Sequence, residues 1–515
     1  MRSTIKIVIL LFFICTSMSG ASFPDMEKYM RQHALIWEQL PMQWNEGAFL
    51  GNGLVGMMVY ADSTLNALVF HLGRPDVTDH RKAPYRKTSI GTEEADKMVD
   101  FCRLDVGKML LFPEGKILSG TFYLDIYNAE LTGHLKTDKG DLTFHAYTPQ
   151  PEEVNIVEVS SGVPYRWKGI PGNPCSPRIR VFPHLKEKLK YKDNPAPVVD
   201  QKDKEGSWVQ SLLAGGDYAT YWKEVPGGKS RSVLYVSTAN EVPASSLSLA
   251  KAMKTVEATQ ITGTKLLKQK TRQWWNAYHE RSFLSIPDKK LENFYFIQMY
   301  KLATCSHPDG PAMDVMGTFF KLSPWPSFWW NLNIQLTYMP IGPANRMEQG
   351  KNFQRLMDEV FPSLVRSIEP CKIGDYTWAL QNYYMYLRYA GADWQDIKQQ
   401  VVPKALDAFA VFDKILCYKE NTWHLTHIES PEYEGFQKYN DSNYGLASLS
   451  WLLQTLIACH DRTSSTHPDY ARWKEILTRL VPYPTNENGL MIAANKPLEK
   501  SHRHYSHLLE IGRAH

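Results

Sequence analysis

The chain has 515 residues, with 58 Lys and Arg against 54 Asp and Glu, so its formal net charge is +4. With 43% hydrophobic and 22% charged residues, the composition is that of a folded globular protein and excludes a disordered chain, a fibrous repeat and a protein with many membrane spans. This charge balance gives no basic surface for nucleic acid. The length indicates about two or three domains.

Residues 1–21 predict a secretory signal peptide. A basic start is followed by an apolar run of about a dozen residues, which is too short to span a bilayer. Ser19 and Ala21 have the small side chains and the spacing that signal peptidase prefers, so we expect cleavage after Ala21. We therefore expect a secreted or periplasmic protein, with no membrane span in the mature chain.

Residues 22–245 predict an antiparallel β-sandwich. Four stretches alternate apolar and polar residues and are separated by turn residues: 123–135, 142–148, 155–161 and 231–238. Short consecutive strands at this spacing are typical of a sandwich. The stretch 162–206 is rich in Pro, Gly and Lys, and it predicts a surface insertion.

After residue 245 the period changes from two to about 3.6 residues, as in helices. Residues 246–285 predict a helical linker and residues 286–515 a helical domain. Its helices are expected at 291–303, 349–368, 376–389, 403–416, 444–460 and 470–480. Helices that alternate with long loops, without strands between them, indicate an all-α toroid whose loops gather at one end. An irregular helical bundle is the alternative.

One loop of the helical domain combines aromatic and amide side chains. Asn331 and Asn333 follow Trp329 and Trp330 in WWNLNIQLTYMP (329–340), and we expect both tryptophans to contact the substrate. Buried amides need hydrogen-bond partners, and a pair of them can grip a substrate hydroxyl or a water. A turn or capping network is the alternative.

A second loop, HLTHIESPEYEGF (424–436), contains Glu429, Glu432 and Glu434. Proline and aromatic residues flank these carboxyls, and an apolar setting raises the pKa of a carboxyl enough for it to donate a proton near neutral pH. A proton donor is therefore expected on this loop, with solvated side chains as the alternative for Glu429 and Glu434, and we expect His427 of the same loop to contact the substrate.

The segment SHRHYSHL (501–508) contains three histidines. They could be metal ligands, but no nearby carboxylate or cysteine pattern completes a site, and Arg503 among them would repel a cation. We therefore expect no metal, and we expect His502 and His504 to contact the substrate or to form a polar packing network.

Taken in order, these segments resemble glycoside hydrolase family 95, the inverting α-L-fucosidases with some α-L-galactosidase members. WNEGAFLGNGLVG (44–56) is similar to the family's opening Trp and "LPxGNGxxG" stretch, with Phe49 where Pro is usual. WNLNIQLTYMP (330–340) resembles "WNINxQMNYWP", and SPE (430–432) and HRHYSHL (502–508) match further family motifs. The order and spacing cover most of the mature chain.

The resemblance implies a β-sandwich, a helical linker and an (α/α)6 barrel that holds the active site. In this family pattern Glu432 would protonate the leaving oxygen, and Asn331 and Asn333 would hold the attacking water. A neutral amide is a poor proton acceptor, so the pair needs a nearby carboxylate. Glu499 is the only acid just before His502, and the family's assisting Asp is unassigned here. The family barrel continues beyond its HRH segment, so the expected toroid is incomplete.

The sequence thus predicts an exported glycoside hydrolase that removes terminal α-L-fucosyl or related L-sugar residues from oligosaccharides with inversion and without a cofactor. An α-L-galactosidase or another exo-glycosidase on the same fold is the alternative within this class. A non-catalytic carbohydrate-binding relative is the alternative from another class. A carbohydrate phosphorylase is disfavoured, because it requires a basic phosphate pocket.

Overall fold

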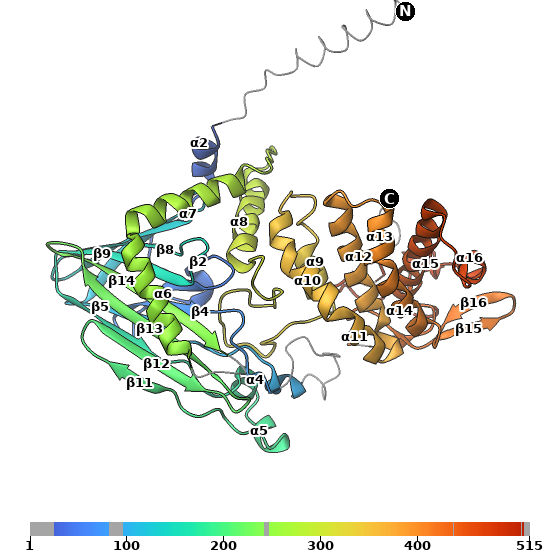
Figure 1. Ribbon diagram of the computed structural model, residues 1–515, viewed down its shortest axis with the longest axis horizontal. Helices are drawn as coiled ribbons and strands as arrows, with labels where there is room; N and C mark the ends of the chain where they lie inside the picture. The colour runs from blue at the N-terminus through green and yellow to red at the C-terminus, as the bar shows by residue number, and fades with distance from the viewer. Residues whose placement is uncertain (1–24, 82–95, 242–246, 436, 506, 509–515) are drawn as a thin grey trace, which may run out of the picture.

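The computed structural model describes residues 25–81, 96–241, 247–435, 437–505 and 507–508. The predicted signal peptide therefore lies outside the described residues. An antiparallel, sheet-rich region comes first along the chain, and a helical region follows it (Figure 1). Within the described part of the chain, each helix is too short or too polar to cross a membrane.

Two antiparallel sheets build the N-terminal region. One has nine strands in the order β1-β6-β7-β8-β9-β14-β13-β12-β11, and the other has five in the order β10-β5-β4-β3-β2. The strands are β1 (Leu35–Trp37), β2 (Ala48–Gly51), β3 (Gly56–Asp62), β4 (Ala67–Gly73), β5 (Lys108–Pro113), β6 (Ile117–Asp125), β7 (Glu130–Thr137), β8 (Asp141–Tyr147), β9 (Val154–Ser161), β10 (Tyr165–Ile170), β11 (Val198–Gln201), β12 (Glu205–Ser211), β13 (Asp217–Pro226) and β14 (Arg231–Glu241).

The two sheets face each other across one hydrophobic core. Along β6, Phe122 and Leu124 are buried and Tyr123 between them is exposed, so alternate side chains enter the core. Phe70 of the smaller sheet meets Phe144 of the larger sheet edge to face, with 5.5 Å between the ring centroids. This face-to-face packing is that of a β-sandwich.

The stretch 162–206 is only partly a surface insertion, so this prediction was too broad. Residues 165–170 form β10, which pairs with β5, and Trp167 of β10 is buried against Phe70 with 5.4 Å between the ring centroids. Two short helices follow, α4 (Pro177–Val181) and α5 (Leu185–Lys188). The prolines and glycines around β10 are typical of loops, and β10 is only six residues long, so the sequence did not predict this core strand.

Helices α6 (Ser248–Thr262) and α7 (Thr264–His279) occupy the region that the sequence predicts as a linker. Helix α6 lies against β13 and β14 (Figure 1). Val256 of α6 and Leu267 of α7 are buried in one cluster with Tyr147, Ile156 and Tyr235 of the larger sheet. The linker region is therefore packed onto the sandwich. Helix α8 (Lys289–Cys305) comes next.

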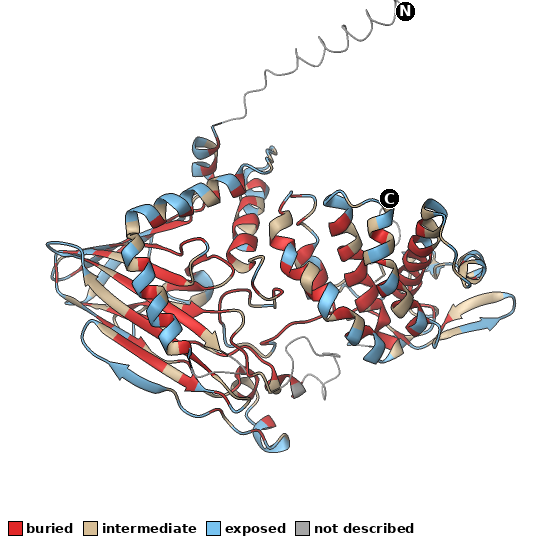
Figure 2. Ribbon diagram, in the orientation of Figure 1, coloured by how far each residue is buried: buried red, intermediate tan, exposed pale blue. Residues whose placement is uncertain are grey.

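The helical region packs around a core of its own. It contains α9 (Asn333–Tyr338), α10 (Lys351–Glu359), α11 (Phe361–Ser367), α12 (Ile373–Tyr389), α13 (Trp394–Gln400), α14 (Val402–Phe412), α15 (Asn443–Thr463) and α16 (Tyr470–Arg479). Three short hairpins occur in it, β15–β16 (Leu416–Lys419 and Thr422–Leu425), β17–β18 (Ile428–Glu429 and Lys438–Tyr439) and β19–β20 (Thr485–Asn486 and Gly489–Leu490). Figure 2 shows buried residues concentrated along α12 and α15.

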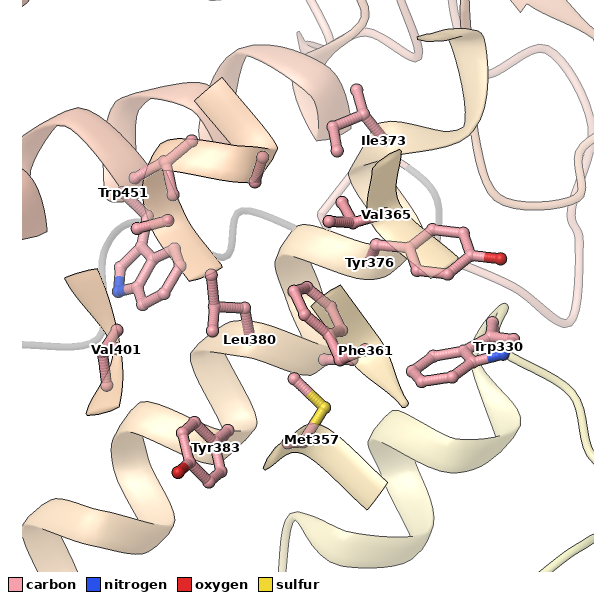
Figure 3. Packing of buried hydrophobic residues seen from close by; sticks show 14 of the residues in the cluster. Trp330, Met357, Phe361, Val365, Ile373, Tyr376, Leu380, Tyr383, Val401 and Trp451 are labelled. Atoms are coloured by element: carbon pink, nitrogen blue, oxygen red, sulfur yellow. The ribbon is translucent and has the colours of Figure 1, made fainter. Parts of the chain in front are cut away.

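Trp330 anchors one side of this helical core. Its indole is 1% exposed and stacks on Tyr376 of α12, with 5.0 Å between the ring centroids and 23° between the planes (Figure 3). Phe328 meets the same indole edge to face at 5.2 Å. Trp330 therefore fixes the end of the loop that leads into α9.

Trp330→Ala tests the structural role of this side chain. Removing a buried indole leaves a cavity, so we expect the free energy of unfolding to fall by about 3–5 kcal/mol. Urea unfolding followed by far-ultraviolet circular dichroism measures this change. Phe294→Ala, which removes an aromatic side chain that is 61% exposed on α8, is the control and should cost less than about 1 kcal/mol. Equal losses in the two variants would contradict the assignment.

Candidate functional site

A cavity of about 490 Å³ opens beside the loop that connects α8 to α9. Its volume lies in the range of small-molecule sites, about 300–1,000 Å³. The connecting loop (residues 306–332) runs between the sheet region and the helices (Figure 1). The lining residues are Val315, Ser323, Trp325, Trp329, Asn331, Leu332, Asn333, Glu432, Arg503 and His504.

Five of the eight site residues predicted from the sequence line this cavity: Trp329, Asn331, Asn333, Glu432 and His504. They come from three segments that are far apart along the chain. His502 is not part of this lining. Its Nδ1 accepts a hydrogen bond from the backbone N–H of His504 at 3.1 Å, and its ring packs against Tyr433, with 5.7 Å between the centroids. The predicted substrate contact of His502 stays a prediction.

The structure places two predicted contact residues away from the cavity lining. Trp330 points into the helical core, because Tyr376 stacks on it. His427 is exposed in a left-handed backbone conformation (φ 53°), and its backbone N–H donates to Asn440 Oδ1 at 3.0 Å. The predicted substrate contact is therefore corrected for Trp330, which is buried in the core, and for His427 it stays a prediction.

The amide of Asn331 is held by a carboxyl group that the sequence did not reveal. Asn331 Nδ2 donates to Asp375 Oδ1 at 2.7 Å, and Tyr444 Oη donates to the same oxygen at 2.8 Å. Asp375 lies near the start of α12, and its backbone carbonyl accepts from Gln335 Nε2 at 2.8 Å. Because an ionised carboxyl only accepts hydrogen bonds, Asn331 must turn its NH2 group toward Asp375. Its carbonyl oxygen then lies on the other side of the amide.

The pKa of Asp375 is raised to about 7, mainly by burial and also by the negative charge of Glu429. The hydrogen bonds from Tyr444 and Asn331 act in the opposite direction, because they stabilise the charged form. A carboxyl that titrates near neutral pH beside a cavity is a candidate for proton chemistry. The signal in the sequence was a single acid in the otherwise uncharged stretch 373–380.

Glu432 is held in an ion pair. Arg503 Nη2 lies 2.8 Å from Glu432 Oε2, and His504 Nε2 lies 3.1 Å from the same oxygen. Partial burial raises the pKa of Glu432, but Arg503 and His504 outweigh it and hold this pKa below its ordinary value. The sequence predicted a raised pKa from the flanking proline and aromatics. It missed the pairing with Arg503, which lies 71 positions further along the chain.

The sheet region supports the cavity wall. Trp329 is 5% exposed and packs with Met98 and Phe101 in a separate cluster. Arg103 of the sheet region is also buried, and it holds the connecting loop: Nη1 donates to Gly317 O at 2.7 Å and pairs with Asp314 at 3.1 Å. The loop is therefore fixed from the sandwich side as well as from the helices.

Among the described residues, no group of three or more His, Cys, Asp or Glu side chains is arranged to hold a metal ion. Glu434, close to Glu432 along the chain, forms ion pairs with Lys496 at 3.0 Å and Lys500 at 3.1 Å.

The residues that line the cavity offer a carboxylate, two amides, an imidazole, a guanidinium and indole surface. Such a lining can bind polyhydroxylated ligands through hydrogen bonds and an apolar face.

No family model and no curated protein sequence matches the chain. Among solved structures, a protein described as a kojibiose phosphorylase from the human microbiome is similar with a TM-score of 0.55 and 10% identity, over 85% of this chain and 66% of that one. A bacterial glucoamylase in complex with acarbose has a TM-score of 0.47 and 8% identity, over 87% and 69% of the two chains. A family GH92 α-mannosidase from Bacteroides thetaiotaomicron has a TM-score of 0.33 and 8% identity, over 84% and 61%. The first likeness shows a shared fold.

Asp375→Asn tests the raised pKa of this carboxyl. The pKa is about 7 in the folded chain against an ordinary 3.8, so unfolding releases a proton and stability falls as the pH rises from about 4 to about 7. Asn cannot ionise and keeps one acceptor oxygen. The free energy of unfolding of the variant, relative to the unsubstituted chain, should therefore rise over this range by up to about 4 kcal/mol.

Urea unfolding at about pH 4 and about pH 8 measures this change, because these values span the ordinary and the raised pKa. Asp309→Asn, at a carboxyl that is 86% exposed, is the matched control. A difference between Asp375→Asn and the unsubstituted chain that is the same at both pH values would refute the raised pKa.

Proposed function

We propose that this chain is a glycoside hydrolase that removes terminal α-L-fucosyl or related L-sugar residues from oligosaccharides with inversion. The observation that carries the proposal is the cavity that brings Glu432 together with Asn331 and Asn333. Inversion needs a proton donor for the leaving oxygen and, across the sugar, a group that activates water. The motif resemblance supports the choice of sugar.

In this mechanism Glu432 protonates the glycosidic oxygen while Asn331 and Asn333 hold the attacking water. Asp375 supplies the carboxylate that the amide pair needs, because it accepts the NH2 of Asn331 at 2.7 Å. The negative charge next to the NH2 group makes the amide oxygen a stronger acceptor for the water proton, and the NH2 group passes one of its own protons to the ionised Asp375 carboxylate in the same step, so the carboxylate takes up the proton that water releases. Asp375 acts through Asn331, so it is a positioning residue. No cofactor enters the scheme.

The free protein holds Glu432 ionised, whereas a general acid must carry a proton when the bond breaks. We assign this protonation to the sugar-bound state. A sugar in the cavity would separate the carboxyl from water and from Arg503, whose side chain is 72% exposed and has room to move outward. Both changes raise the pKa of Glu432.

We further propose that the helical region belongs to an (α/α)6 toroid and that residues 1–21 direct export. The helices α10 to α16 share one core, which supports the first proposal. The basic start and short apolar run support the second.

A carbohydrate phosphorylase is the second candidate, because the structure supplies a feature that the sequence did not predict. Arg503 and His504 both line the cavity, and such groups can bind inorganic phosphate in place of the attacking water. An α-L-galactosidase would use the same residues on a different sugar. A non-catalytic carbohydrate-binding relative would hold the sugar in this cavity without cleaving it.

Proton NMR of the chain incubated with an α1,2-fucosylated oligosaccharide or with an α-L-galactoside, each with and without inorganic phosphate, distinguishes these four candidates. We expect initial release of β-L-fucose, independent of phosphate, because inversion turns the α-linkage into the β-anomer. A sugar 1-phosphate formed only with phosphate would establish the phosphorylase. Release from an α-L-galactoside alone would change the sugar, and binding without any release would favour the binding relative.

Glu432→Gln tests the proton donor. We expect kcat/KM for the oligosaccharide to fall by about 100-fold or more, because Gln cannot protonate the leaving oxygen. For α-L-fucosyl fluoride, whose leaving group needs little protonation, the loss should be much smaller. Glu434→Gln, in the same loop and outside the cavity lining, is the matched control and should leave both rates nearly unchanged. Equal losses on the two substrates would remove Glu432 from this role.

A further inference from the structure

Trp325 presents an exposed aromatic face to the cavity. Its side chain is 44% exposed, whereas the neighbouring Trp329 is 5% exposed. The two indoles meet edge to face, with 5.0 Å between the centroids and 87° between the planes. Despite this contact the indole of Trp325 stays 44% exposed in the cavity lining, and covering apolar surface of this kind releases free energy in proportion to the area removed from water.

The backbone on both sides of Trp325 is fixed by residues of the sheet region. Arg178 Nη1 donates to Pro324 O at 2.6 Å, and the backbone N–H of Arg103 donates to Pro326 O at 2.7 Å. The two prolines further restrict the backbone, because each has a fixed φ and constrains the residue before it. The position of the indole is therefore set when the protein folds.

Arg178 also supports the indole ring directly. Its guanidinium carbon lies 5.1 Å from the ring centroid of Trp325, within the range of a cation–π contact. Arg178 is 5% exposed, and its Nη2 donates to Asp96 at 3.0 Å; Asp96 also pairs with Lys188 at 3.0 Å. Two cations thus hold one buried carboxylate, and this ion-pair group makes Arg178 a rigid anchor.

We propose that Trp325 is a stacking platform for a second sugar ring of the substrate, beyond the ring that is cleaved, and that Arg178 is its positioning residue. The polar groups of the cavity, Glu432 with Asn331 and Asn333, suit the hydroxyls and the bond of the cleaved sugar. The face of Trp325 suits the apolar C–H face of another ring. Because the platform is rigid before binding, little conformational entropy is lost on association. This inference rests on the proposed function and adds which side chains hold the sugar next to the one that is cleaved.

Binding is measured by isothermal titration calorimetry with the α1,2-fucosylated oligosaccharide, in chains that carry Glu432→Gln so that the ligand is not consumed. Adding Trp325→Ala should weaken binding about tenfold or more, which corresponds to the loss of one stacked ring. Replacing Trp325 by Phe instead, which keeps a flat aromatic face, should retain most of the binding affinity. Adding Tyr418→Ala, which removes an equally exposed aromatic outside the cavity, at 44%, should leave binding unchanged.

Turnover measured with Glu432 intact separates positioning from a general effect on the fold. Arg178→Lys keeps the charge but loses the planar fork. We expect KM for the oligosaccharide to rise several-fold with kcat within about twofold, and kcat/KM for α-L-fucosyl fluoride to stay unchanged, because the fluoride lacks a second ring. A parallel loss on both substrates would reduce Arg178 to a structural residue.

The outcomes distinguish the two proposals. If the chain cleaves the oligosaccharide and adding Trp325→Ala to the Glu432→Gln chain leaves binding as tight as in Glu432→Gln alone, the platform is refuted and the hydrolase stands. If the chain neither binds nor cleaves the oligosaccharide, the proposed function fails and the platform falls with it. Thermal melting of each variant shows whether it is folded, and the Trp325→Phe variant keeps the test decisive if Trp325→Ala unfolds.

Discussion

The contacts at the start of α12 are the constraint on which the candidate site depends. Asp375 accepts a hydrogen bond from Asn331, and the next residue, Tyr376, stacks on Trp330. Tyr444 of α15 donates to the same carboxyl oxygen. A buried carboxyl needs such partners, because desolvation without them is costly. The first turn of α12 thus fixes two adjacent loop residues: Trp330 is held in the core, and Asn331 is held in the cavity wall.

Much of the fold could be predicted from local patterns. The alternating strands at 123–161 and the helices near 291–303, 376–389 and 444–460 are present, because one face of each element is buried and the sequence repeats with the period of that face. Short elements escaped prediction. Strand β10 lies among prolines and glycines, and α13 has only seven residues, so neither repeats its pattern often enough to be recognised.

The candidate site was predictable only where a motif lies in one stretch of sequence. Asn331, Asn333 and Glu432 come from such motifs and line one cavity. The partners that decide their chemistry come from elsewhere. Asp375 is 44 positions from Asn331, and Arg503 is 71 positions from Glu432. Residues that are adjacent in sequence can also have different surroundings: Trp330 packs in the core, whereas Asn331 lines the cavity. Charge environments of this kind depend on tertiary contacts, which a local pattern does not contain.

Because Arg103 and Arg178 anchor the connecting loop, the domain boundary in this protein does not separate two structurally independent parts. A boundary near residue 285 separates two hydrophobic cores, yet the loop beyond it takes part of its shape from residues before it. A helical half produced by itself would lack both arginines, and the carbonyls of Gly317, Pro324 and Pro326 would turn to water. Exchanging the sandwich for that of another protein would likewise replace the side chains that fix one wall of the cavity.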